Sequence, residues 1–271
     1  MVLTTKLNVS VQNARSLSSG FLRRVMLARP FAITLTVALA ACSGLFSQDA
    51  QVEYESAIYR SAVVTPETVH ALQPLPAGES VIVVSWLTQQ RLPCQGEQPE
   101  CTFTVNKSPI WVTLDGEIKK KCSSWHLAGT ALQRRLEQLL GLPPNSPPRF
   151  KKVAFVEMSV SRENIDRPCL GLDTTNPAEP KCTLRINSTQ KPDVLNFVER
   201  QMADSYLIQD TGGPGYPFSR LGYTYDWNPG AAKVGHYGVS EFLVSPGATV
   251  VVRAQTLTDR YCGAEDQSAA Q

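Results

Sequence analysis

The pattern of apolar and polar positions predicts a chain built mainly of β-strands. Runs rich in β-branched and apolar residues, separated by Gly, Pro and Asn turns, predict strands over 80–88, 102–105, 110–114, 153–160, 183–186, 221–227, 237–244 and 249–257. We expect the second and third of these strands to form a hairpin across residues 106–109. The short, frequent turns favour antiparallel pairing.

Helical spacing predicts two main helices between these strands. In residues 127–140, Leu132, Leu136 and Leu139 fall on one face and Arg135 on another, and Gly141 follows. A second helix is expected from Pro192 to about residue 207. The sequence therefore predicts a single α+β domain with a mainly antiparallel sheet.

The N-terminal segment differs from the rest of the chain in charge. Although Lys and Arg exceed Asp and Glu by 26 to 24 overall, residues 1–41 contain several cations and no acid, so the remainder has a slight acidic excess. No long run of like charge occurs, which gives no reason to expect a nucleic acid partner. Arg29 precedes an apolar stretch over 31–39 that is too short to span a bilayer. Residues 1–41 are thus predicted to be a signal peptide, with Met26 as a possible true start.

The four residues Leu39-Ala40-Ala41-Cys42 resemble the lipobox of bacterial lipoproteins. The resemblance implies that Cys42 is the lipid-bearing first residue of the mature protein, and that the chain contacts the membrane through this lipid. Ser43 stands where Asp often marks retention in the inner membrane, which favours the outer membrane with the domain facing the periplasm. The alternative is an ordinary signal peptide cleaved next to Cys42.

Six further cysteines remain, an even number that indicates disulfides in an oxidising compartment. Six cysteines allow 15 pairings. Because two pairs bracket short loops, we predict the bridges Cys94–Cys101, Cys169–Cys182 and Cys122–Cys262. The alternative, a zinc site with histidine, lacks the spacing of known ligand motifs, so we predict no metal and no cofactor.

These features divide the chain into four parts. We predict a signal peptide over 1–41, a lipidated tether over 42–50, a folded extracytoplasmic domain over 51–262 and a flexible tail over 263–271.

The segment 212–241 is unusually rich in aromatic residues. Strand alternation places Tyr223, Tyr225 and Trp227 on one face, with Tyr237 following in the next strand. One interpretation is an aromatic surface that binds a ligand or a partner. The other is that these side chains form a wall of the core.

Enzyme motifs are mostly missing from the sequence. It contains no Gly-x-Ser-x-Gly elbow, P-loop or His-Glu-x-x-His helix. Residues 238–251, GVSEFLVSPGATVV, loosely resemble the last conserved strand pair of ADP-ribosyltransferases, which implies a catalytic role for Glu241. The sequence departs from that pattern at Val239 and in having no clear Ser-Thr-Ser strand. His236 is a second candidate catalytic residue because histidine can act as a general base and Ser240 and Glu241 lie nearby in sequence.

Three functions fit these observations. The first is a lipid-anchored envelope protein that acts as a binding or scaffolding module through its aromatic C-terminal segment, with an envelope protein or the cell wall as partner. The second is an envelope enzyme centred on Glu241 and His236. The third is a purely structural lipoprotein.

Overall fold

A computed structural model describes residues 49–94, 100–206 and 215–263. The predicted signal peptide, Cys42 and the predicted tail beyond Gly263 lie outside the described residues. No helix in the described ranges is long and apolar enough to cross a membrane.

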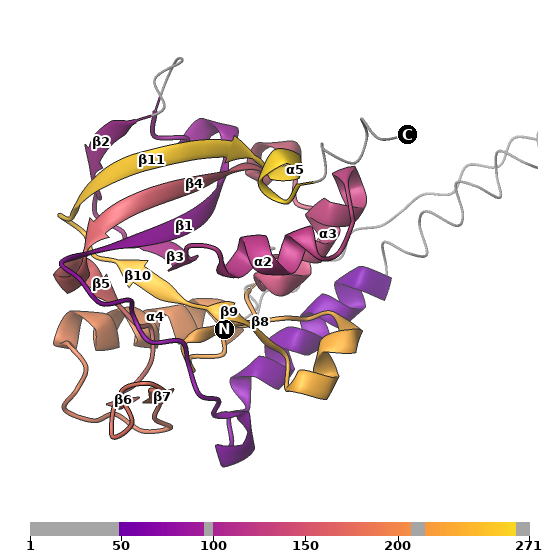
Figure 1. Cartoon of the computed structure of the whole chain (residues 1–271). Helices are drawn as coiled ribbons and strands as arrows, with labels where there is room; N and C mark the ends of the chain where they lie inside the picture. The colour runs from indigo at the N-terminus through magenta and orange to yellow at the C-terminus, as the bar shows by residue number, and fades with distance from the viewer. Residues whose placement is uncertain (1–48, 95–99, 207–214, 264–271) are drawn as a thin grey trace, which may run out of the picture. The chain divides into compact units, whose positions relative to one another are not determined.

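The main sheet has seven strands in the order β2-β11-β4-β1-β3-β10-β5 (Figure 1). Their bounds are β1 Ser80–Thr88, β2 Cys101–Thr104, β3 Ile110–Leu114, β4 Lys152–Ser161, β5 Ile165–Asp166, β10 Phe242–Val244 and β11 Thr249–Leu257. All neighbouring strands in it are antiparallel. The α+β fold with a mainly antiparallel sheet is therefore confirmed.

The remaining strands form two separate two-stranded antiparallel sheets. They join β6 (Leu172–Asp173) to β7 (Lys181–Cys182), and β8 (Tyr223–Tyr225) to β9 (Tyr237–Ser240). The strand predicted over 183–186 is absent, since β7 ends at Cys182. The strand predicted over 237–244 is interrupted at Glu241, so that β9 pairs with β8 whereas β10 pairs with β3 and β5.

The hairpin predicted across 106–109 is wrong, although both of its strands exist. β2 pairs with β11, and β3 lies between β1 and β10. The burial patterns explain the difference. Alternate residues of β2 are exposed, as suits an edge strand, whereas Val112, Thr113 and Leu114 of β3 are all buried, as suits a central strand.

The helices are α2 Glu117–Ser123, α3 Gly129–Leu139, α4 Pro192–Tyr206, α5 Thr258–Tyr261 and a helix over residues 49–62. Short 3-10 helices span Pro66–Thr68, Gln89–Arg91, Pro148–Phe150, Arg162–Asn164 and Pro229–Val234. The two main predicted helices correspond to α3 and α4. The helix over 49–62 and α2 were not predicted, and the former includes residues 49 and 50, which were expected to belong to a tether.

Each face of the sheet has its own core. On one face, Val84, Trp86 and Phe155 pack against leucines of α3 and residues of α2 and α5, and Figure 1 shows these three helices together beside the long strands. On the other face, residues of β11, β4 and β1 share a cluster with Phe242 and Val244 of β10. Since β11 and β10 are far apart in the strand order, the sheet must curl around this cluster.

The structure contains the three predicted disulfides. Cys94 is joined to Cys101, Cys169 to Cys182 and Cys122 to Cys262. The last bridge spans 140 residues and links α2 to the residue that follows α5. It holds the C-terminal end of the domain against its middle.

Candidate functional site

The predicted aromatic surface is buried. Tyr223, Tyr225 and Trp227 are 2%, 7% and 1% exposed, and Tyr237 is partly buried. Tyr225 and Trp227 pack with Tyr54 and Ile58 of the helix over 49–62. These side chains form a wall of the core, which corrects the expectation that they line an exposed contact surface.

The predicted alternation along this strand is nevertheless present. Thr224 and Asp226 point away from the aromatic side and bond to α3, with the Thr224 hydroxyl donating to the Leu139 carbonyl over 2.7 Å. Thr224 is 9% exposed and Asp226 is 3% exposed. The strand is thus covered on both faces, by α3 on one side and by the N-terminal helix on the other.

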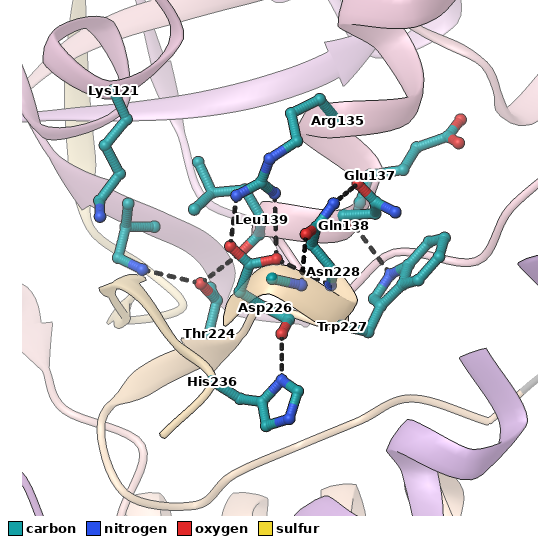
Figure 2. A network of polar contacts seen from close by, with 12 residues as sticks. Lys121, Arg135, Glu137, Gln138, Leu139, Thr224, Asp226, Trp227, Asn228 and His236 are labelled. Carbon is teal, nitrogen blue, oxygen red and sulfur yellow. Dashed lines mark hydrogen bonds and ion pairs between the residues drawn. The ribbon is translucent and has the colours of Figure 1, made fainter. Parts of the chain in front are cut away.

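Asp226 is the centre of the polar network in Figure 2. The guanidinium of Arg135, on α3, donates to both carboxylate oxygens of Asp226 over 3.0 and 2.6 Å. The backbone N–H of Asn228 donates to the same carboxylate over 3.0 Å. Bidentate geometry of this kind gives a strong charge-assisted pair.

Further bonds in the same network fix the residues after Asp226 (Figure 2). The Trp227 indole N–H lies 3.2 Å from the Glu137 carbonyl and 3.0 Å from the Leu142 carbonyl. The Asn228 side chain donates to the Gln138 amide oxygen over 2.8 Å. Every group in this network is already paired within the protein, so it fastens β8 to α3 and leaves no vacant position for a ligand.

His236 belongs to this network and not to the surroundings of Glu241. Its Nδ1 lies 2.7 Å from the Asp226 carbonyl oxygen, and its ring stacks on Tyr225 with 4.6 Å between centroids. His236 precedes β9 and Glu241 follows it, and within the described chain no hydrogen bond or ion pair joins them. The two candidate catalytic residues are therefore not brought together.

A large cavity opens where β1 and β3 separate. The ladder between them ends at the pair Val84↔Thr113, whereas β1 continues along β4 as far as Thr88. The cavity that includes this gap has a volume of about 1210 Å³. Residues 85–87 of β1 and 110–112 of β3 line it, together with Gln201 of α4, the segment 216–218 and Glu241. A cavity of this size accommodates a small-molecule ligand.

Glu241 occupies the break between β9 and β10 and faces this cavity. Its Oε2 atom is buried and, within the described ranges, has no hydrogen-bond partner. Burial raises the pKa of its carboxyl to about 8, although the positive charge of Arg167 acts in the opposite direction. At neutral pH this carboxyl is mainly protonated, and it then offers a donor as well as an acceptor.

Arg167 is the cation beside Glu241, and no sequence motif indicated it. Its Nη1 donates to the Gly222 carbonyl over 2.8 Å, its Nη2 donates to the Gln73 carbonyl over 2.5 Å, and its guanidinium lies 4.0 Å from the centre of the Phe242 ring. Burial lowers the pKa of Arg167 to about 10, so it stays charged at neutral pH. It follows directly after strand β5, where Asp166 is also buried.

Two other polar residues stand near Glu241. The charges of Glu241 and Arg220 both act on Tyr206, whose hydroxyl donates to the Phe218 carbonyl over 2.5 Å and whose pKa burial raises to about 12. The Nε atom of Arg220 is buried and, in the described part of the chain, has no acceptor. Arg220 also has a left-handed backbone, with φ +49°. Unpaired buried groups and strained backbone are features that concentrate at functional sites.

No group of three or more metal-ligating side chains comes together among the described residues. Comparisons of the chain with family models, with curated proteins and with solved structures find no match. Function must therefore be argued from the cavity and the residues that line it.

Proposed function

We propose that this chain is a lipid-anchored envelope protein whose α+β domain binds a small ligand in the cavity beside Glu241. The observation that carries the proposal is Glu241, a residue that lines a cavity of about 1210 Å³ and whose carboxyl has a buried oxygen without a partner in the described ranges. A buried polar group without a partner is costly in a structural role. A ligand that hydrogen-bonds to Glu241 removes this cost.

The envelope location is supported by two independent features. The lipobox-like residues 39–42 favour a lipid on Cys42. The three disulfides need an oxidising compartment, such as the periplasm. The outer membrane, with the domain facing the periplasm, remains our proposed location.

Binding in the cavity replaces the aromatic surface in this proposal, although the same segment contributes to it. Thr224, Tyr225 and Tyr216 line the cavity. A scaffolding role toward an envelope protein or the cell wall would instead need a contact surface outside the cavity. The test must therefore separate a small ligand from a macromolecular partner.

The test is native mass spectrometry of the full chain purified from its own envelope in mild detergent. We expect a small-molecule adduct that survives purification and is lost, or at least tenfold depleted, in Glu241→Leu, which removes both the donor and the acceptor. The control is Glu163→Leu, since Glu163 is exposed and does not line the cavity. Absence of any adduct, with protein or cell-wall fragments co-purifying equally with wild type and Glu241→Leu, would overturn the cavity proposal in favour of scaffolding.

A second candidate function is catalysis by Glu241. A carboxyl with a pKa of about 8 is suited to donate a proton at neutral pH, and the resemblance to ADP-ribosyltransferases concerns the same residue. His236 has no part in this candidate function because it is bonded elsewhere. The enzyme proposal requires NAD turnover by the wild type that Glu241→Gln abolishes, and a wild type without turnover rules it out.

A further inference from the structure

Lys152 is a partly buried cation whose strongest charged neighbour is another cation. It is the first residue of β4, stands opposite Thr88 of β1, and lines the cavity. Burial lowers the pKa of its amine, and the positive charge of Arg91 lowers it further. None of the carboxylates in the described ranges is paired with it. Arg91 is exposed, so solvent weakens the repulsion between the two cations, and an anion placed between them would remove what remains.

The charged residues that line the cavity are mostly cations, like Lys152. Among the described residues that line it, Arg91, Lys107 and Lys152 are cations and Glu241 is the one acid. The charge of buried Arg167 acts directly on Glu241. The three lining cations are therefore not neutralised by this acid, and the cavity attracts negative charge.

The cavity also has an apolar part. Phe103 of β2 and Trp111 of β3 are both only partly buried in the core and line the cavity. Trp111 packs between the rings of Phe197 and Phe218. An occupant that uses the cations and these rings together combines a negative group with an apolar body.

We propose that the cavity selects an anionic ligand with an apolar body, whose negative group lies between Lys152 and Arg91. This inference rests on the proposed function, because it names the class of ligand that the same cavity takes. A carboxylate, sulfonate or phosphate group each meets the requirement, since all offer several acceptor oxygens to ammonium and guanidinium donors.

The test compares two probes that differ only in charge. They are 1-naphthylacetate and its neutral amide, 1-naphthylacetamide, titrated by calorimetry into the full chain in detergent, with detergent alone as the blank. We expect the carboxylate to bind at least about tenfold more tightly than the amide. In Lys152→Met the two probes should bind about equally, with the affinity for the amide within about threefold of wild type. The matched control is Lys151→Met, because Lys151 is exposed and does not line the cavity.

The outcomes separate this inference from the proposed function. Equal binding of both probes by the wild type overturns the anion selectivity but leaves the cavity as a binding site. Loss of selectivity in Lys151→Met as well as in Lys152→Met also overturns it, because selectivity would then follow net charge and not position. Binding of neither probe counts against both proposals. An unchanged affinity for the amide shows that Lys152→Met is folded.

Discussion

Glu241 and Asp226 are both buried acids, but their partners differ. Asp226 receives two bonds from Arg135 and one from the backbone, whereas Glu241 keeps an oxygen unpaired in the described part of the chain. Asp226 thus has a cationic partner within the fold, whereas burial favours the neutral form of Glu241. The first arrangement suits a structural residue, and the second suits one that meets a ligand.

The protonation of Glu241 predicts how stability depends on pH. Its pKa of about 8 in the folded protein lies above the usual value, so between about pH 4.5 and 8 the folded state holds a proton that the unfolded state has released. Stability of the wild type therefore falls as pH rises through this window, at up to about 1.4 kcal/mol per pH unit from this group. Glu241→Gln removes the effect, so we expect it to become increasingly stabilising, relative to wild type, from pH 5 to pH 8 in urea unfolding.

Glu163→Gln is the control for that comparison because Glu163 is exposed. Its difference from wild type should stay constant over the same pH range. If Glu241→Gln and wild type show parallel stability curves, Glu241 does not release a proton on unfolding and its assigned environment is wrong.

The close packing around Gly222 predicts a loss of stability when this residue alone is replaced. A Cβ atom there would lie 2.6 Å from Cδ of Arg167 and 2.9 Å from Sγ of Cys182, and the residue has φ +75°. Gly247 has a similar φ of +85° but no neighbour within 4 Å. Since strain alone costs about 1 kcal/mol and steric overlap in the core costs about 1–3 kcal/mol more, we expect Gly222→Ala to destabilise clearly more than Gly247→Ala in urea unfolding. Equal losses would contradict the close packing of Gly222 against Arg167.

At the scale of elements, the positions of the strands were easier to predict than their pairing in the sheet. β1, β4 and β11 lie close to their predicted ranges because period-two patterns and turn residues are local signals. The pairing of β2 with β11 instead of β3 depends on which strand becomes an edge, and that depends on contacts far apart in sequence. The break at Glu241 has no local signal either, since the sequence pattern over 237–244 predicts one continuous strand.

The candidate site was only partly predictable for the same reason. Glu241 was indicated by a resemblance covering residues 238–251. Arg167, just after β5, and Lys152, at the start of β4, are far from Glu241 in sequence. Only folding brings the charge of Arg167 close to Glu241 and places Lys152 in the lining of the same cavity. The aromatic residues near Tyr223 carried a clear pattern, but a strand with alternating aromatics looks the same whether its outer face meets solvent or a helix. The helix over 49–62, which covers them, was not predicted.

The attachment of β8 to α3 predicts an energetic coupling between Arg135 and Asp226. Removing Arg135 leaves the Asp226 carboxylate, 4% exposed, without its cation. We expect Arg135→Met to cost about 3 kcal/mol, as breaking a buried pair usually does. Asp226→Asn should also destabilise, and the double variant should be less unstable than the sum of the two single changes by about 1–3 kcal/mol.

Urea unfolding of the four proteins measures this coupling. The control is the exposed pair Arg60–Glu53, whose coupling should stay below about 1 kcal/mol. Additive losses for Arg135 and Asp226 would mean that β8 is held on α3 by apolar packing and not by this ion pair.

At the scale of the whole molecule, the disulfides and the predicted anchor act on different parts of the chain. Cys122–Cys262 closes the described domain near its C-terminal end, whereas Cys42 precedes the described residues. The seventh cysteine is thus the one left over after three bridges are formed. An odd cysteine in an oxidising compartment needs an explanation, and a lipid on its sulfur supplies one.

The proposed anchor predicts that membrane attachment depends on Cys42. Lipid on the Cys42 sulfur, together with an acyl chain on the new N-terminus, would give the two or more hydrocarbon anchors that stable attachment requires. Wild-type protein should therefore incorporate an alkyne fatty acid and stay with washed membranes, whereas Cys42→Ser should lose the label completely. Ser43→Asp should keep the label and move the protein from outer to inner membrane fractions. Label retained in Cys42→Ser would contradict lipidation at this residue, and an unchanged distribution of Ser43→Asp would contradict the role given to Ser43 in sorting.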